Sequence, residues 1–268
     1  MIHLITQFFK VNYKSVDEIL IRKRQDEITH CFKVNLLHND VEKIHFLYEK
    51  EDDVNFLKEE GIDIHNNKII LYNLGCRLKY SLIFNYANEF LKDKVCVYLH
   101  ADMCIHSGFN KLNLNNTNNK LYSLTSHNTN CNGKLNCNCT RQFHTSRGLY
   151  GVTFDGFVFK SPINEKIINE ANHHVQRLGG ENRLICIFKD YNYVVECPNQ
   201  VLKCIHHHKI KIFNNMTKDY WITRNGEDKP QNYYSHIHKI QKNKSWDDKI
   251  VGGGIPFFKG SCKFINNL

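Results

Sequence analysis

The chain has 268 residues, of which 41% are hydrophobic and 24% charged. This composition excludes a disordered or fibrous chain and fits one large domain with a substantial core. The formal net charge of +9 favours anionic partners such as nucleotides, phosphosugars, nucleic acid or an acidic surface. The alternative is an AT-rich coding sequence, which inflates Lys together with Asn and Ile without any such role.

The sequence also excludes a membrane-spanning helix, because no apolar run approaches the roughly 20 residues needed to cross a bilayer. The first ten residues lack the flanks of a signal peptide. Several of the 11 cysteines lie inside apolar runs, among them Cys31, Cys96 and Cys186. They are typical of small buried side chains in a reducing compartment. We therefore expect a cytoplasmic protein.

Strands and helices are predicted to alternate over the first hundred residues. Apolar runs and period-two alternation predict strands at 2–9, 42–48, 68–72 and 95–99. Helical spacing of apolar residues predicts helices at 16–36, 52–60 and 80–91, with Gln25 as a candidate break in the first. This order is typical of βαβ units, so the fold class is α/β with a mainly parallel sheet flanked by helices.

The second half is less regular. Strands are predicted at 120–125, 154–160, 193–196 and 201–208, and helices at 165–173 and 181–189. Residues 128–144 are predicted to form a polar loop that carries cysteines. The tail from residue 209 onward is basic and aromatic, and it contains a flexible segment at Gly252–Gly254.

The apolar strand 95–99 ends abruptly in His100, Ala101 and Asp102. Ligands of open α/β sheets bind just beyond the carboxyl ends of such strands. Carboxylate oxygens suit a hard divalent cation that keeps positions open for substrate phosphates. Asp102 is therefore a candidate ligand for a metal or a phosphate, and the alternative is an aspartate that only starts a turn.

Two further carboxylates are candidates for chemistry. Glu181 follows Gly179 and Gly180 at the start of a predicted helix. There it serves either as a general base or as an acidic residue that the helix dipole favours. Asp155 stands at the start of the strand 154–160, where it holds sugar hydroxyls or begins a turn.

Histidines and cysteines provide two candidate metal sites. In a strand, His206 and His208 share one face and His207 takes the other. Two histidines on one face near a carboxylate are candidate metal ligands, and the alternative is a basic edge strand exposed to solvent. Cys131, Cys137 and Cys139, with His127 or His144, form a candidate zinc site. Their spacing differs from paired Cys-x-x-Cys motifs, so a loop with free thiols is the alternative.

An ordered set of motifs over residues 1–210 resembles a family of GT-A fold glycosyltransferases: small nucleotide-sugar glycosyltransferases of large DNA viruses, bacteria and plants. The motifs are Leu4–Phe9, Gly75–Tyr80 with Phe84–Asn88, Val95–Asp102, Leu121–His127, Asp155–Pro162, Gly179–Arg183, and the histidines 206 and 208. The resemblance implies a GT-A (Rossmann-like) domain at 1–210. It leaves 211–268 as a C-terminal extension packed on the site or covering it.

The resemblance also implies the activity and the cofactors. Members transfer a sugar from a nucleotide sugar, here a UDP-sugar by expectation, to a hydroxyl of a glycan or protein, and they use Mn²⁺ or Mg²⁺ (EC 2.4 class). A chain of viral origin would act in the host cytoplasm or the virion.

The site residues follow by match to the family motifs. Asp102 meets the metal and the diphosphate, and His206 or His208 completes metal coordination. Gln7, Arg77, Asn85 and His100 fall in segments that contact the donor nucleotide. Glu181 matches the catalytic base of inverting members, and Asp155 falls in the acceptor-side strand.

One departure from the family pattern leaves alternatives open. His100 replaces the first acid of the Asp-x-Asp motif, so an inactive GT-A domain is one alternative. A nucleotidyltransferase is another, although the segment Phe9–Lys14 lacks the glycine-rich loop expected after its first strand. A third is a non-enzymatic protein that stacks nucleic-acid bases on the aromatic residues of the tail.

Overall fold

The computed structural model describes residues 1–12, 16–129, 135–140, 143–145, 148–150, 154–175, 180–198, 201–207, 220–222, 228–230, 263–265 and 268, some of them through the backbone alone. The helices of this part are α1 (Glu18–Leu37), α2 (Glu51–Glu59), α3 (Tyr80–Phe90), α4 (Leu114–Thr117), α5 (Glu165–Glu170) and α6 (Gly180–Asp190), with a 3-10 turn at Phe109–Lys111.

The strands of the first half are β1 (Ile2–Thr6), β2 (Val41–Tyr48), β3 (Ile69–Asn73), β4 (Val95–Leu99), β5 (Met103–Ser107) and β6 (Lys120–Thr129). The later strands are β7 (Leu135–Thr140), β8 (Phe143–Thr145), β9 (Gly148–Tyr150), β10 (Phe154–Lys160), β11 (Val194–Cys197), β12 (Lys203–His206), β13 (Tyr220–Ile222), β14 (Asp228–Pro230) and β15 (Lys263–Phe264).

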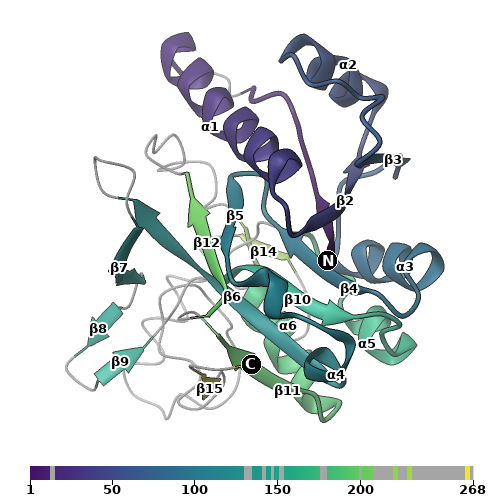
Figure 1. Cartoon of the computed structure of the whole chain (residues 1–268), viewed down its shortest axis with the longest axis vertical. Coiled ribbons are helices and arrows are strands. Elements are labelled where there is room, and N and C mark those ends of the chain that lie inside the picture. Colours follow the sequence, from purple (N-terminus) through teal and green to yellow (C-terminus); the bar gives the residue numbers. More distant parts are fainter. Residues whose placement is uncertain are drawn as a thin grey trace.

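The central sheet has the order β15-β11-β6-β10-β4-β1-β2-β3 (Figure 1). Neighbouring strands from β4 to β3 are parallel, as are β6, β11 and β15. Only β10 runs antiparallel to both of its neighbours, β4 and β6. The order β3-β2-β1-β4 is that of one half of a doubly wound Rossmann-like sheet. The fold class predicted from the sequence, an α/β (Rossmann-like) fold with a mainly parallel central sheet flanked by helices, is confirmed.

Helices cover both faces of the sheet because its central strands are apolar on both sides. All five residues of β1 and all five of β4 are buried. Leu4 packs into the core beneath α1 and α2, whereas the adjacent Ile5 packs into the core beneath α3, α5 and α6. This alternation follows from the period of two in a strand.

A smaller sheet extends from the long strand β6. The strand β12 pairs in parallel with β6 and antiparallel with β5, and β7 pairs antiparallel with β6. The helix α1 packs against β5, where the Asn35 side chain donates to the Met103 carbonyl (3.0 Å) and accepts from the Ile105 amide (2.9 Å). These bonds satisfy backbone groups at the edge of β5, so they bring α1 and β5 together.

The first hundred residues match the predicted order of elements, with one correction. The helix α1 is continuous through Gln25, so the candidate break there is wrong. The Gln25 side chain is buried, accepts from the Val11 amide (2.8 Å) and donates to the Phe9 carbonyl. This polar residue lies on the core side because the loop after β1 needs its hydrogen bonds.

The rest of the chain departs further from the predictions. The strand β6 continues to Thr129, β7 falls within 128–144 and β8 begins there, so the predicted loop is wrong in part. The strand β5 was not predicted, α5 ends at Glu170 rather than residue 173, and β12 covers only Lys203–His206. Short strands whose stability comes from distant partners give weak local signals.

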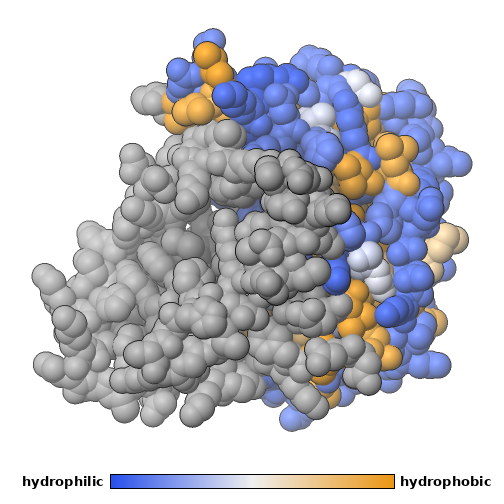
Figure 2. Space-filling model, turned by 60° about the vertical axis from the view of Figure 1, so that its left-hand side comes forward, coloured by the Kyte–Doolittle hydropathy of each residue, from blue (hydrophilic) through white to orange (hydrophobic). Residues whose placement is uncertain are grey.

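Most of the predicted extension 211–268, including Gly252–Gly254, lies outside the described residues. Near the end of the chain, β15 pairs in parallel with β11 at the edge of the central sheet. The division at residue 210 stays a prediction. Among the described helices, none combines the length and the apolar character that crossing a membrane requires. The described surface in Figure 2 is mostly hydrophilic, with hydrophobic residues in separate small groups.

Candidate active site

Polar side chains meet at the edge of the sheet where the parallel strands end. The chain leaves β4 at Leu99, and the antiparallel strand β10 enters at the same edge, where Gly156 pairs with Leu99. The His100 amide donates to the Asp155 carbonyl at 3.1 Å. The side chains of His100, Asp102 and Asp155 are therefore brought to the place where open α/β sheets bind ligands.

Asp102 is buried, and one of its carboxylate oxygens accepts hydrogen bonds from two side chains. Its Oδ2 accepts a short hydrogen bond from Arg24 Nη2, and His206 Nε2 lies 2.9 Å away. The Arg24 guanidinium also donates to Glu27 Oε2 and to the His207 carbonyl, both at 2.8 Å. The Asp102 carboxylate is thus paired with a fixed positive charge that has other partners holding it in place.

His206 joins the Asp102 carboxylate to a second acid. Its Nδ1 lies 3.9 Å from Asp155 Oδ2, on the opposite side of the ring from Asp102. His206 is the last residue of β12, which runs parallel to β6 and ends at the same edge of the sheet. The structure therefore brings together three predicted site residues, Asp102, Asp155 and His206.

Glu181 and His100 form the other side of this cluster. Glu181 lies in the first turn of α6, and its Oε1 is 3.7 Å from His100 Nε2. The start of α6 is held by His173, whose Nε2 donates to the Gly180 carbonyl at 3.1 Å. These contacts place a carboxyl group in a largely water-free position, since the Glu181 side chain is 18% exposed.

Burial shifts the proton affinities of these two groups in opposite directions. The pKa of Glu181 is raised from 4.5 to about 8, first by burial and further by the negative charge of Asp155. Burial lowers the pKa of His100, although Asp155 and Asp102 oppose the shift. At neutral pH, His100 is therefore neutral, and Glu181 has a proton affinity suited to a general acid or base.

Two buried tyrosines lie beside Glu181. The Tyr98 ring packs edge-on against His100 with centroids 5.7 Å apart, and Tyr80 packs against Tyr98 at 5.9 Å. Burial and the Glu181 charge raise the pKa of both phenols. Neither hydroxyl has a hydrogen-bond partner in the part of the chain that the structure describes. Each hydroxyl therefore keeps an unused capacity to donate and to accept a hydrogen bond beside Glu181.

The predicted divalent cation fits this cluster in part. Two neighbouring ligands of an octahedral Mg²⁺, each at about 2.0–2.1 Å, lie about 2.9–3.0 Å apart. Asp102 Oδ2 and His206 Nε2 are 2.9 Å apart, so this pair has the required spacing and donor types. The Arg24 charge opposes a cation at the same carboxylate. An anionic ligand would add negative charge and so offset this repulsion between Arg24 and the cation.

The other predicted site residues lie farther from this cluster or outside the described residues. Gln7 follows β1 at the same edge and is half-buried, next to Thr6, whose hydroxyl donates to the Leu99 carbonyl (3.0 Å). Arg77 is exposed between β3 and α3. Asn85 is exposed in the middle of α3, and no described contact brings it to the cluster. His208 lies outside the described residues.

The candidate zinc site of the loop cannot be placed. Cys131 lies outside the described residues, and only the backbone is described for Cys137, Cys139 and His144. His127 is buried, and its Nδ1 lies 3.3 Å from the Cys204 carbonyl. The predicted zinc site thus stays a prediction.

Arg24 is the site residue that the sequence did not indicate. It follows Arg22 and Lys23 in α1, and such a run of charges is typical of a solvated helix face. In the structure its side chain is only 4% exposed, and its partner Asp102 is 78 residues away. A partner that distant leaves no local pattern.

Comparisons with known proteins find distant structural similarity only. No protein-family model matches the chain, and no curated protein matches it in sequence. Among solved structures, HddC from Yersinia pseudotuberculosis complexed with GMP-PN is 12% identical, with a TM-score of 0.40 over 65% of this chain and 81% of that one.

Two other solved structures are similar at the same level. A Bacillus anthracis protein assigned as a glucose-1-phosphate thymidylyltransferase, in complex with a sucrose, is 10% identical (TM-score 0.36; 63% of this chain and 73% of that one). The glycosyltransferase GlyE of Streptococcus pneumoniae TIGR4 is 15% identical (TM-score 0.37; 75% of this chain and 46% of that one). Similarity this low assigns no activity to the chain.

Proposed function

We propose that the chain is a glycosyltransferase that moves a sugar from a nucleotide-sugar donor to a hydroxyl acceptor. The observation that carries this proposal is the position of Glu181, a buried carboxyl with a raised pKa, beside the Asp102–His206–Arg24 cluster at the carboxyl edge of the sheet. One side of the site offers a base, and the other offers groups that bind phosphate. The resemblance of the sequence motifs to GT-A enzymes agrees with this assignment.

Glu181 is the proposed base. In the reaction its carboxylate takes the proton of the acceptor hydroxyl while the hydroxyl oxygen bonds to the anomeric carbon of the sugar. The bond from that carbon to the diphosphate oxygen breaks, and the nucleoside diphosphate leaves with the electron pair. Because the base must be ionised, the raised pKa of Glu181 makes this step faster as the pH rises toward about 8.

Asp102 and His206 are the proposed ligands of Mn²⁺ or Mg²⁺, and Arg24 is a second positive group near the diphosphate. When bound, the cation neutralises the charge on the leaving diphosphate as a Lewis acid. Because Arg24 already pairs with Asp102, we expect the cation to bind weakly alone. A diphosphate adds the negative charge that the cluster lacks, so nucleotide and cation should bind together.

Asp155 is the proposed acceptor-side residue. Its Oδ2 is buried, and its carbonyl accepts from the His100 amide, which fixes the backbone at the start of β10. A carboxylate held between His206 and Glu181 can accept a hydrogen bond from a sugar hydroxyl. Asp155 also raises the pKa of Glu181, so it acts on the base as well.

No described feature favours a nucleotidyltransferase over this proposal. The segment after β1 packs Phe8 and Val11 into the core and has no glycine. A phosphate-binding loop instead presents free backbone amides, whereas the Val11 amide is bonded to Gln25. An inactive domain is the alternative that experiment must exclude, because His100 stands where the motif has an acid.

A thermal-shift screen of nucleotide sugars with Mn²⁺ and with a chelator tests the function. A ligand that binds only the folded protein raises its melting temperature, so a UDP-sugar that does so in Mn²⁺ would support the proposal. Release of the nucleoside diphosphate on addition of acceptor would identify the reaction. Salt-dependent binding of DNA or RNA with no response to any nucleotide sugar would favour the nucleic-acid-binding alternative.

A further inference from the structure

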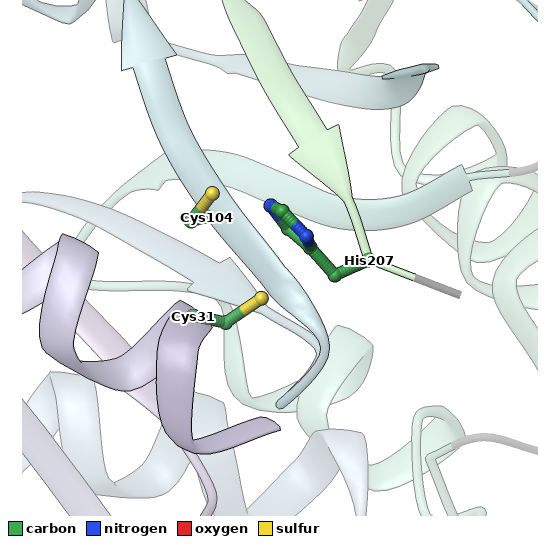
Figure 3. A group of neighbouring side chains, drawn as sticks. All are labelled: Cys31, Cys104 and His207. Carbon is green, nitrogen blue, oxygen red and sulfur yellow. The ribbon is translucent and has the colours of Figure 1, made fainter. Parts of the chain in front are cut away.

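A second group of metal-binding side chains lies next to the candidate active site. Cys31 of α1, Cys104 of β5 and His207, which follows β12, point toward one another (Figure 3). Their ligand atoms, two thiol sulfurs and a ring nitrogen, all lie within 4.8 Å of one another. Both cysteines are buried, and His207 is partly exposed. The two cysteines are therefore shielded from water, whereas part of His207 is exposed to solvent.

These ligand types select a soft or borderline metal ion. Thiolate and imidazole together suit Zn²⁺, whereas Mn²⁺ and Mg²⁺ prefer oxygen. Ligand atoms of a tetrahedral zinc, with bonds of about 2.0–2.3 Å, are about 3.5–3.8 Å apart. No pair of these atoms therefore needs to approach by more than about 1.3 Å. We propose that Cys31, Cys104 and His207 bind a structural Zn²⁺, separate from the cation proposed at Asp102.

A tetrahedral ion at this group needs a fourth ligand. His30 is exposed, and its ring packs against that of His207 with centroids 4.7 Å apart. His30 is therefore a candidate for this fourth ligand, and water is the other candidate. Either completes the coordination number of four that structural zinc sites have.

The site ties together the three segments that carry the active-site cluster. Cys31 lies two helical turns after Arg24 on α1. Cys104 lies two residues after Asp102, and His207 directly follows His206. The His207 amide donates to the Asp102 carbonyl at 2.9 Å, and its carbonyl accepts from Arg24. A bound Zn²⁺ would fix the positions of Arg24, Asp102 and His206 relative to one another.

Metal content of the full-length protein tests this proposal. After purification with zinc and dialysis, we expect about one Zn²⁺ per chain by mass spectrometry. The part-exposed His207 makes His207→Ala the variant least harmful to folding, and we expect it, Cys31→Ala and Cys104→Ala to lose the ion. Cys96→Ala is the matched control, because Cys96 is equally buried but lies in the core beneath α3, α5 and α6. Zinc retained in His207→Ala and Cys104→Ala would overturn the proposal.

X-ray absorption at the zinc edge of the unaltered protein gives a test that needs no variant. We expect two sulfur neighbours at about 2.3 Å and one or two histidine nitrogens at about 2.0–2.1 Å. Three or more sulfur neighbours would instead point to the loop cysteines, and loss of the ion in a Cys131→Ser, Cys137→Ser, Cys139→Ser triple variant would overturn the proposal. A Cys31–Cys104 disulfide found by mass spectrometry in protein purified with zinc would do the same.

Chelation and nucleotide binding separate this proposal from the proposed function. Removing zinc should lower the melting temperature of the wild type and of Cys96→Ala but leave that of His207→Ala unchanged. Glu181→Gln and Asp102→Asn should retain the full zinc content. If Asp102→Asn keeps the metal-dependent nucleotide binding of the wild type and Glu181→Gln keeps full transfer, while both keep zinc, the proposed function fails and the zinc site stands.

Discussion

His100 Nε2 lies 3.7 Å from Glu181 Oε1, so the residue that departs from the Asp-x-Asp motif faces the proposed base. Neutral His100 adds no negative charge beside Glu181, whose pKa is already raised by burial and by Asp155. A second carboxylate at position 100 would make ionisation of Glu181 still harder. The histidine therefore keeps the base within reach of neutral pH.

This relationship predicts the pH profile of a variant that restores the motif. For the wild type, we expect kcat/KM to rise with pH and to level off near the Glu181 pKa of about 8. In His100→Asp, the added carboxylate should move this rise to higher pH, by about one unit. Rates measured from pH 6 to 10 with the donor found by the thermal-shift screen check the shift. His100→Asn is the control, because it removes the ring without adding charge. A rise at the same pH in His100→Asp would contradict the coupling.

Removing the base itself should lower the rate of transfer and leave the affinity for the nucleotide sugar unchanged. Glu181→Gln keeps the shape of the side chain but cannot take a proton, so we expect transfer to fall by about 100-fold or more. Calorimetric affinity for the nucleotide sugar should stay within about twofold of the wild type. Glu165→Gln is the matched control, because Glu165 stands in the first turn of α5 and is exposed. Full turnover in Glu181→Gln would exclude Glu181 as the base.

The same ionisation gives a stability test that needs no substrate. The unfolded chain releases the Glu181 proton near pH 4.5, and the folded chain holds it to about 8. Between these values the folded state binds more protons, so the contribution of Glu181 to stability falls as the pH rises. We expect Glu181→Gln to gain stability over the wild type from pH 5 to 8, measured by urea denaturation. A constant difference over this range would show that the pKa of Glu181 is not raised in the folded state.

The sequence predicted those parts of the site whose signal is local. The run from Val95 to Leu99 predicted a buried strand, and the abrupt change at His100 placed Asp102 at its carboxyl end. The glycines before Glu181 marked the start of a helix, which the structure confirms as α6. The parallel order also followed from alternation of strands and helices along the chain.

What the sequence could not predict depends on contacts between distant segments. Arg24 differs from its exposed neighbour Lys23 in being buried against partners that include Asp102 and the His207 carbonyl, both far away in the sequence. His207 was placed on the opposite face of a strand from His206, whereas β12 ends at His206 and the chain turns His207 toward Cys31 and Cys104. The pairing of β12 with β5 and the packing of α1 on β5 bring these residues into contact.

The buried position of Arg24 predicts a large loss of stability when it is removed. Arg24→Met leaves the carboxylates of Asp102 and Glu27 without their shared cation, at side-chain exposures of 11% and 12%. Breaking a buried ion pair in this way typically costs about 3 kcal/mol or more. We expect a loss of this size in urea denaturation at pH 7. Lys23→Met, at an exposed position of the same helix, should change stability by less than about 0.5 kcal/mol. Equal effects of the two variants would mean that the Arg24–Asp102 pair adds nothing to folding.

The pairing of Arg24 with Asp102 also predicts that cation and nucleotide bind cooperatively. Because Arg24 offsets the Asp102 charge, Mn²⁺ alone should bind weakly, and UDP should strengthen its binding by at least about tenfold. Linkage requires that Mn²⁺ strengthen UDP binding by the same factor. In Asp102→Asn the ligand charge is gone, so calorimetry should show UDP affinities with and without Mn²⁺ that agree within about twofold. Asp52→Asn, at an exposed position of α2, should keep the wild-type enhancement. If Mn²⁺ leaves UDP affinity unchanged in the wild type, Arg24 rather than a metal is the positive group at the diphosphate, and the cation proposed at Asp102 is excluded.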